Sequence, residues 1–181
     1  MKCVIIPLAD GCEEMEVVII ADVLRRADIN TTLAAIGNVT VTASRGIKLA
    51  ADCLWNDCNL SQYDAIIIPG GAEGVELIRK HNGVRDALKA QHASGRMVAA
   101  ICAGPLVLHD AGLLKNRKAT CYPTLAEKLP EADYICKTVV TDNNIITSRG
   151  PGTAFEFALT IVATLTGKDR AENVRNALCM E

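Results

Sequence analysis

Short aliphatic runs alternate along the chain with longer segments in which apolar residues recur every three or four positions. Short aliphatic runs are typical of strands buried on both faces of a sheet, whereas the wider spacing is typical of helices with one buried face. The runs predict strands at 2–8, 31–36, 64–68, 98–101 and 118–121. The wider spacing predicts helices at 13–27, 74–81, 83–94, 106–110, 124–129, 153–166 and 168–179.

Two further segments have the pattern of β-hairpins, because strand-forming residues flank a short turn-forming sequence. The paired stretches are 39–43 with 47–50, and 137–141 with 144–148. Residues 51–63 show no regular pattern and are predicted to form a loop, with Trp55 packed as a plug. Strands that alternate with helices predict an α/β fold with a doubly wound, mostly parallel sheet. The length predicts one domain over residues 1–181.

Composition supports this fold and excludes some functions. Half of the residues are apolar but only 3% are aromatic, as expected for an aliphatic core around a covered parallel sheet. The net charge is −2 and there is no basic cluster, which argues against nucleic-acid binding. The first apolar run is followed by three glutamates, so neither a signal peptide nor a membrane anchor is predicted. We therefore expect a cytoplasmic protein whose eight cysteines are free thiols.

The strongest candidate catalytic residue is Cys102, which follows the predicted strand 98–101 and precedes a Gly-Pro turn that starts a helix. N–H groups and the helix dipole at such a corner favour a thiolate, and hydrolases place a serine nucleophile in the same way. An inert buried cysteine is the alternative. Cys53 and Cys58 are five residues apart with no histidine nearby, so no metal site is predicted there.

A glutamate is the second candidate. On a helical wheel Glu16 falls within the apolar stripe of the helix 13–27, whereas Glu14 falls on the opposite side and is predicted to be a solvated surface charge. A carboxyl group that faces the core has a raised pKa and can be a protonated hydrogen-bond donor at neutral pH. The alternative is a rotated or frayed helix that exposes Glu16 to water.

Glycine-containing turns follow three other predicted strands, at Gly11, at Gly70 and Gly71, and at Gly150 with Pro151. Ligands of doubly wound folds bind at the carboxyl ends of the strands, so these turns and Cys102 are expected to converge on one site. Gly70 and Gly71 permit a close backbone approach and are candidates to present N–H groups to a ligand.

Four motifs together resemble the ThiJ/PfpI superfamily, within the branch of the Parkinson's-disease-associated protein and its bacterial relatives. They are GCEEME at 11–16, IIIPGG at 66–71, AAICAGP at 99–105 and TSRGPGT at 147–153. The resemblance runs from residue 2 to about residue 167. It implies a flavodoxin-like sandwich and a homodimer with an active site close to the subunit interface.

The resemblance also implies roles for individual residues. Cys102 matches the reactive nucleophile, and Glu16 matches the protonated glutamate that hydrogen-bonds its sulfur. Gly71 and Ala103 match positions whose N–H groups form an oxyanion site. Residues that match positions near the pocket are Arg45, which is expected from the partner subunit, and Pro151.

The chain departs from its relatives in its histidines. Tyr122 stands where many relatives have a histidine that assists proton transfer, and Ala103 stands where PfpI-type peptidases have one. A neutral phenol is a poor base near pH 7, so Glu16 is the candidate proton shuttle. The chain's own histidines, at positions 81, 92 and 109, match no catalytic position, which weakens the peptidase and glutamine amidotransferase alternatives.

The resemblance implies a glutathione-independent glyoxalase or protein deglycase that acts on glyoxal, methylglyoxal or their early adducts and needs no metal or organic cofactor. A small reactive carbonyl compound is the expected substrate, and neither nucleic acid nor a membrane is an expected partner. The alternative is an oxidative-stress sensor or redox-regulated chaperone that operates through oxidation of Cys102. A role in thiamine-related metabolism rests on the family's name alone.

Overall fold

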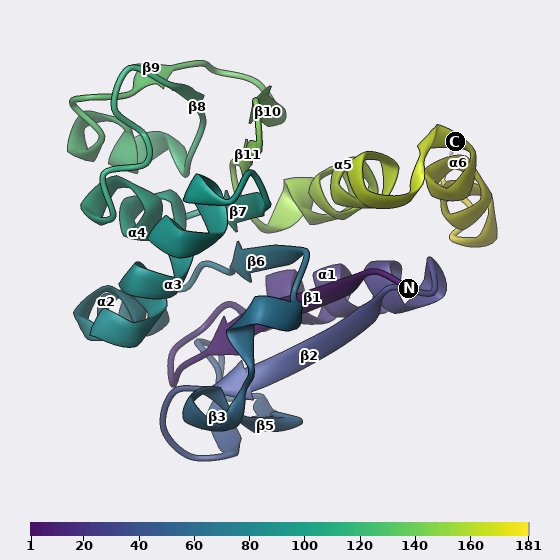
Figure 1. The fold of residues 1–181 in the computed structure, drawn as a ribbon, viewed down its shortest axis with the longest axis horizontal. Helices are drawn as coiled ribbons and strands as arrows, with labels where there is room; N and C mark the ends of the chain where they lie inside the picture. The colour runs from purple at the N-terminus through teal and green to yellow at the C-terminus, as the bar shows by residue number, and fades with distance from the viewer. Residues whose placement is uncertain (181) are drawn as a thin grey trace.

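The computed structural model describes residues 1–180, which form a seven-stranded sheet between two layers of helices (Figure 1). From edge to edge the strands are β10 (Val139–Asp142), β11 (Ile145–Ser148), β7 (Met97–Ile101), β6 (Ala65–Ile68), β1 (Cys3–Leu8), β2 (Asn30–Ala35) and β5 (Cys53–Leu54). Neighbouring strands are parallel except β10 and β11, which form the predicted hairpin. The α/β prediction is confirmed.

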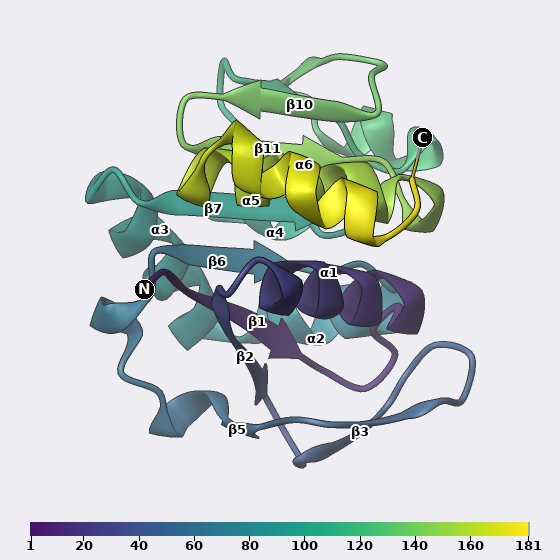
Figure 2. The same cartoon turned by 90° about the vertical axis from the view of Figure 1, so that its right-hand side faces the viewer.

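Helices cover both faces of this sheet (Figure 2). On one face lie α1 (Glu14–Arg26), α5 (Ala154–Thr166) and α6 (Lys168–Ala177). On the other lie α2 (Ala72–Lys80), α3 (Asn82–Ala93) and α4 (Pro105–Asp110). Each layer packs on its own aliphatic core, and Cys102, at the end of the inner strand β7, contacts both cores. Over residues 1–180, no helix has the length and apolar character needed to cross a membrane.

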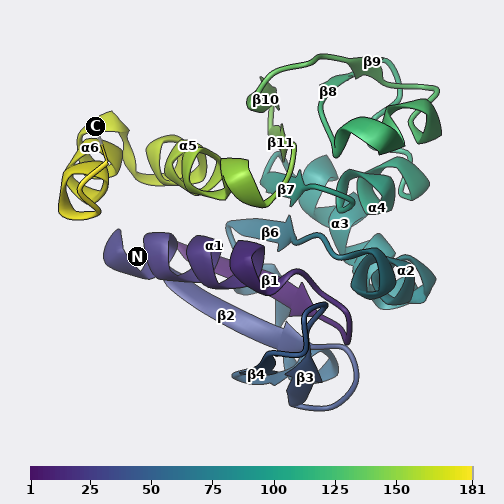
Figure 3. The ribbon, with the colours of Figure 1, turned by 180° about the vertical axis from the view of Figure 1, so that it is seen from behind.

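Two small sheets lie outside the main one (Figure 3). β3 (Thr40–Thr42) and β4 (Lys48–Ala50) form the predicted antiparallel hairpin, and β8 (Lys118–Ala119) pairs in parallel with β9 (Asp133–Tyr134). 3₁₀ helices occupy Trp55–Asp57, Leu60–Gln62, Pro123–Lys128 and Pro151–Thr153. The last of these leads directly into α5.

The structure corrects three details of the predicted elements. The predicted loop 51–63 contains the edge strand β5, whose pairing with β2 is long-range and leaves no periodic pattern in two residues. The strand β9 is equally short and was not predicted. Helix α5 exposes one side, including Phe155, although its sequence predicts burial along most of its surface. Trp55 is buried, as predicted.

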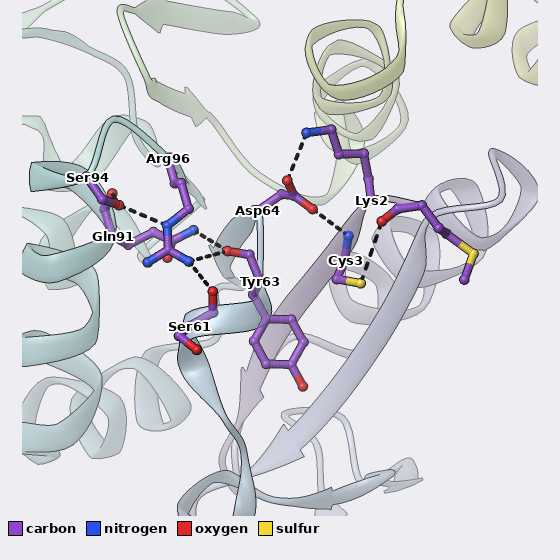
Figure 4. A network of polar contacts seen from close by, with 9 residues as sticks. Lys2, Cys3, Ser61, Tyr63, Asp64, Gln91, Ser94 and Arg96 are labelled. Atoms are coloured by element: carbon purple, nitrogen blue, oxygen red, sulfur yellow. Dashed lines mark hydrogen bonds and ion pairs between the residues drawn. The ribbon is translucent and has the colours of Figure 1, made fainter.

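A polar network joins the segments at the amino ends of the central strands (Figure 4). The Arg96 guanidinium donates to the carbonyl oxygens of Ser61 and Tyr63, at 2.8 and 2.9 Å, and the buried Gln91 amide also donates to Tyr63 O, at 3.0 Å. Asp64 accepts from Lys2 Nζ at 2.8 Å. These bonds fix the start of β6 against α3, at the end of the sheet opposite to the candidate site.

Candidate active site

Cys102 lies at the corner between β7 and α4 in a left-handed backbone conformation, with φ of +63°. This conformation is uncommon for residues other than glycine, and its cost must be met by surrounding contacts. Two hydrogen bonds hold the backbone there, since Cys102 N–H donates to Ser148 O at 3.0 Å and Tyr122 N–H donates to Cys102 O at 2.8 Å. The corner is therefore a strained nucleophile elbow, as its sequence predicts.

The Glu16 side chain is fully buried beside this corner, so the prediction that it faces the core is confirmed. One carboxyl oxygen, Oε2, accepts a 2.6 Å hydrogen bond from Gly70 N–H, while Oε1 is buried with no partner. Burial raises the pKa of Glu16 to about 7, although the Gly70 N–H and the contact with the Cys102 thiol oppose the shift. The group can therefore hold or release a proton near neutral pH.

Backbone N–H groups surround the sulfur on its other sides. Those of Ala103 and Gly71 are directed at Cys102 and lower the pKa of its thiol, which makes them available to an oxyanion formed next to the sulfur. Gly71 has a φ of +92°, and a Cβ there would overlap the carbonyl oxygen of Gly11. A Cβ on Gly70 would lie 2.6 Å from the Cys102 Cβ. Gly70 is thus required for the close approach of the chain to Cys102, and Gly71 for its close approach to the backbone at Gly11.

The pKa of the Cys102 thiol is raised, whereas the helix terminus predicts that it is lowered. Burial and the negative charge of Glu16 raise the pKa of the thiol to about 12, and the two N–H groups only partly offset them. Helix α4 has six residues, so its dipole is a weak source of stabilisation. The resting site therefore holds a thiol next to a proton acceptor rather than a free thiolate.

Glu14 is not the solvated surface charge that the helical wheel predicts, because only 3% of its surface is exposed. Its carboxylate accepts hydrogen bonds from Ser44 Oγ and Arg45 N, both at 2.8 Å. Although burial acts to raise its pKa, these hydrogen bonds and that of the Ile47 N–H lower it. The β3–β4 hairpin folds over the first turn of α1 and covers Glu14, a long-range contact that helical periodicity does not report.

A cavity of about 570 Å³ opens above Cys102 at the carboxyl edge of the sheet. The predicted site residues that line it are Arg45, Gly71, Cys102, Ala103, Tyr122 and Pro151, and Gly11 joins them. Arg45 of this chain reaches the cavity through the hairpin turn, and a contribution of Arg45 from a partner subunit stays a prediction. Gly70 and Glu16 lie beneath this lining. Ser44 and Thr124 also line the cavity and were not predicted, because no local pattern distinguishes them from other turn residues.

Tyr122 lies across the cavity, partly exposed, with its ring next to Gly150. None of the three histidines lines this cavity, and His81 instead caps helix α3 by accepting from Val84 N–H at 3.3 Å. Within residues 1–180, no group of three or more metal-ligating side chains could hold a metal ion. The proton acceptor nearest to the sulfur is therefore the Glu16 carboxyl group.

The fold is a three-layer α/β sandwich, and it defines a class of proteins that present a cysteine on a strained elbow next to a buried carboxyl group. Comparison with known sequences gives the family. The chain belongs to the DJ-1/PfpI family, whose family model matches residues 2–164.

Named relatives match over nearly the whole chain. It is 41% identical to protein dj-1beta of Drosophila melanogaster, over 98% of this chain and 96% of that one. It is 37% identical to a Caenorhabditis elegans protein named glutathione-independent glyoxalase DJR-1.2, over 98% and 95%. Protein DJ-1 homolog B of Arabidopsis thaliana is 44% identical, and the chain spans 40% of its length. The crystal structure of Drosophila DJ-1beta superimposes with a TM-score of 0.96, at 40% identity, over 99% of this chain and 98% of that chain.

Proposed function

We propose that the protein is a cysteine-dependent, cofactor-independent glyoxalase or deglycase that converts glyoxal or methylglyoxal, or their early adducts, to hydroxyacids. The observation that carries this proposal is the placement of the Cys102 thiol between a carboxyl group that titrates near neutrality and two N–H donors. The relative named as a glutathione-independent glyoxalase supports the same class of reaction.

The first step is addition of the Cys102 sulfur to the aldehyde carbon. Because burial keeps the thiol protonated, Glu16 in its carboxylate form accepts the proton as the carbon–sulfur bond forms. The aldehyde oxygen takes up the negative charge at the position served by the Gly71 and Ala103 N–H groups, and it is then protonated to give a hemithioacetal.

The second step moves a hydrogen within the adduct. A base removes the proton from the former aldehyde carbon, and reprotonation at the neighbouring carbonyl carbon gives a hydroxyacyl thioester on Cys102. Glu16 is the group placed to carry this proton, since its pKa of about 7 suits both directions of transfer. Water then cleaves the thioester and releases lactate from methylglyoxal, or glycolate from glyoxal, with the thiol restored.

The cavity volume indicates the size of substrate that the site can hold. Its 570 Å³ falls within the range of small-molecule sites and is larger than a three-carbon aldehyde requires. The additional space accommodates a hemithioacetal or aminocarbinol adduct of the same aldehyde, which extends the proposed substrate class from the free aldehydes to their early adducts. Arg45 and Tyr122 on the rim are the side chains positioned to contact the larger part of such an adduct.

The experiment is a lactate assay with methylglyoxal as substrate and no added glutathione. We expect the unmodified protein and a Cys136→Ser control, which replaces an exposed cysteine outside the cavity, to form lactate at the same rate. Cys102→Ala and Glu16→Gln are expected to be inactive in the same assay. Lactate formation that persists in Cys102→Ala would refute the proposal.

A second candidate function is oxidation sensing at Cys102. A sulfinate there would accept hydrogen bonds from the Gly71 and Ala103 N–H groups and from protonated Glu16. A Toxoplasma gondii DJ-1 structure described as oxidized superimposes on this chain with a TM-score of 0.96. Mild peroxide followed by peptide mass analysis tests it. Oxygen addition confined to Cys102 would support the role, whereas addition spread evenly over all eight cysteines would exclude it.

We also propose that the protein forms a homodimer through an exposed apolar patch. Met15 and Val18 form an apolar surface on α1, and each is more than half exposed. Ile47 of the hairpin is also more than half exposed, and its N–H donates to Glu14, which brings the hairpin against this part of α1. The patch adjoins Arg45 at the cavity rim. Sedimentation should give the dimer mass, and Val18→Asp should shift it to the monomer mass. A monomeric unmodified protein would refute the proposal.

A further inference from the structure

Two cysteines that the proposed chemistry does not use face each other at the far edge of the main sheet. The sulfur atoms of Cys53 and Cys58 are 3.3 Å apart. Both residues are free thiols and both are partly exposed. A disulfide bond is about 2.05 Å long, so the two sulfurs need to approach each other by little more than about 1 Å.

The local fold creates this approach. Cys53 begins the edge strand β5, paired in register with Ala34 of β2. The 3₁₀ turn Trp55–Asp57 then reverses the chain, with the buried Trp55 as its anchor and a 3.2 Å hydrogen bond from Cys58 N to Trp55 O. Cys58 follows in an extended conformation and its thiol donates to Leu54 O at 3.4 Å. Formation of a disulfide between Cys53 and Cys58 therefore requires side-chain rotation rather than rearrangement of the backbone.

The chain on the other side of Cys58 is also fixed. Asn59 caps the next turn by accepting from the N–H and hydroxyl groups of Ser61, and Arg96 binds Ser61 O at 2.8 Å (Figure 4). Both ends of the 53–58 segment are thus tied to the sheet. The contact between the two sulfurs is a property of the folded chain and does not depend on a mobile loop.

This thiol pair is distant from the candidate active site. Four strand spacings separate β5 from β7, which is roughly 19 Å at the usual distance between neighbouring strands. Cys102 cannot reach either sulfur across that distance.

We propose that Cys53 and Cys58 form a second, independent redox site that closes to an intrachain disulfide by exchange with a low-molecular-weight disulfide. The Cys58 thiolate attacks the small disulfide, forms a mixed disulfide and releases one small thiolate. The Cys53 sulfur, on losing its proton, then attacks the Cys58 sulfur and releases the second. Two protein thiols are oxidised to one disulfide, and one small disulfide is reduced to two thiols.

The order of attack follows from the surroundings of the two sulfurs. Burial and the neighbouring Cys58 raise the pKa of Cys53 to about 11, and the carboxylates of Asp52 and Asp57 add to the shift. Cys53 is therefore the poorer first nucleophile. It is better suited to the second step, in which the target sulfur is already held next to it.

The test uses the unmodified protein in buffers with a series of ratios of oxidised to reduced glutathione. Remaining thiols are alkylated and the protein is cleaved after lysine and arginine. Cys53 and Cys58 then lie in one peptide, residues 49–79, and Cys102 lies in another, residues 97–115. Residues 3–25 provide a matched control, because this peptide also holds two cysteines, Cys3 at the start of β1 and Cys12 beyond its other end.

We expect peptide 49–79 to escape alkylation at both cysteines and to be two hydrogens lighter than its reduced form, at ratios that leave peptide 3–25 doubly alkylated. Cys53→Ser should instead accumulate one glutathione on Cys58. Ring closure should continue in Cys102→Ala, which separates this site from the proposed glyoxalase activity. The proposal fails if peptide 49–79 keeps two alkylated cysteines at every ratio, or if its oxidation requires Cys102.

Discussion

The raised pKa of the Cys102 thiol gives a direct measure of its coupling to Glu16. After burial, the negative charge of Glu16 is the largest cause of the increase to about 12. Replacing Glu16 by glutamine removes the charge and keeps an oxygen that can accept the Gly70 N–H. We therefore predict that Glu16→Gln lowers the pKa of Cys102 and at the same time abolishes turnover, because the proton acceptor is lost.

The size of this shift follows from the geometry around Gly70. An ideal Cβ placed on Gly70 would lie 2.6 Å from Glu16 Oε2 and 3.0 Å from the Cys102 sulfur. The two charged atoms are therefore at most about 5.6 Å apart. At an effective dielectric constant of about 20 this separation corresponds to at least ~3 kcal/mol, or roughly two pKa units. The pKa of Cys102 should fall from about 12 to about 10 or lower.

The assay follows the rate of Cys102 alkylation by iodoacetamide as a function of pH, quantified on peptide 97–115, in which Cys102 is the one cysteine. Glu14→Gln is the matched control. Glu14 lies on the same helix turn, but its charge raises the pKa of Cys12 and is not among the charges that act on Cys102. A midpoint that stays the same or rises in Glu16→Gln would contradict the proposed coupling.

Three other predictions concern stability, each measured by urea unfolding. The folded-state pKa of Glu16 (about 7) lies above its ordinary value of 4.5, so the native state binds the extra proton and the free energy of unfolding declines as pH rises between these values. Glu16→Gln should remove this decline, which is about 3 kcal/mol. An equal decline in the variant would contradict the prediction. Gly71→Ala should lower the free energy of unfolding by more than about 2 kcal/mol, because Gly71 has a positive φ and a Cβ there would overlap Gly11 O. Gly152 has open space around it, so Gly152→Ala should change the free energy of unfolding by less than about 0.5 kcal/mol. Similar losses in the two variants would refute the argument. Phe157→Ala should lower the free energy of unfolding by about 3–5 kcal/mol, because the ring is fully buried. Phe155 on the same helix is partly exposed, so Phe155→Ala should lower it by less than about 1 kcal/mol.

The sequence was sufficient to predict the features that depend on local pattern. Buried strands, helix faces and glycine turns follow from side-chain periodicity and backbone freedom, so the sheet, the burial of Glu16 and the elbow at Cys102 could all be predicted. The convergence of the turns at Gly71 and Cys102 also follows, because the carboxyl ends of parallel strands share one edge, whereas the contact of Glu16 with Cys102 is implied by the family resemblance.

Features that depend on contacts between distant segments could not be predicted. Glu14 is buried by Ser44 and Arg45, about thirty residues away, which no helical wheel represents. The edge strand β5 is defined by β2 rather than by its own two residues. The pKa of Cys102 was predicted with the wrong sign, because burial and the Glu16 charge depend on the assembled site.

The donors that face the sulfur belong to the main chain at Gly71 and Ala103, and this has a consequence for how the site can evolve. Substitutions change side chains and leave peptide N–H groups in place as long as the fold persists. The rim is different, because Arg45 and Tyr122 contribute side chains to the cavity wall. Mutation at the rim can therefore alter which small molecules enter the cavity and leave these N–H groups in place, so under the proposed function single rim changes would alter the range of substrates.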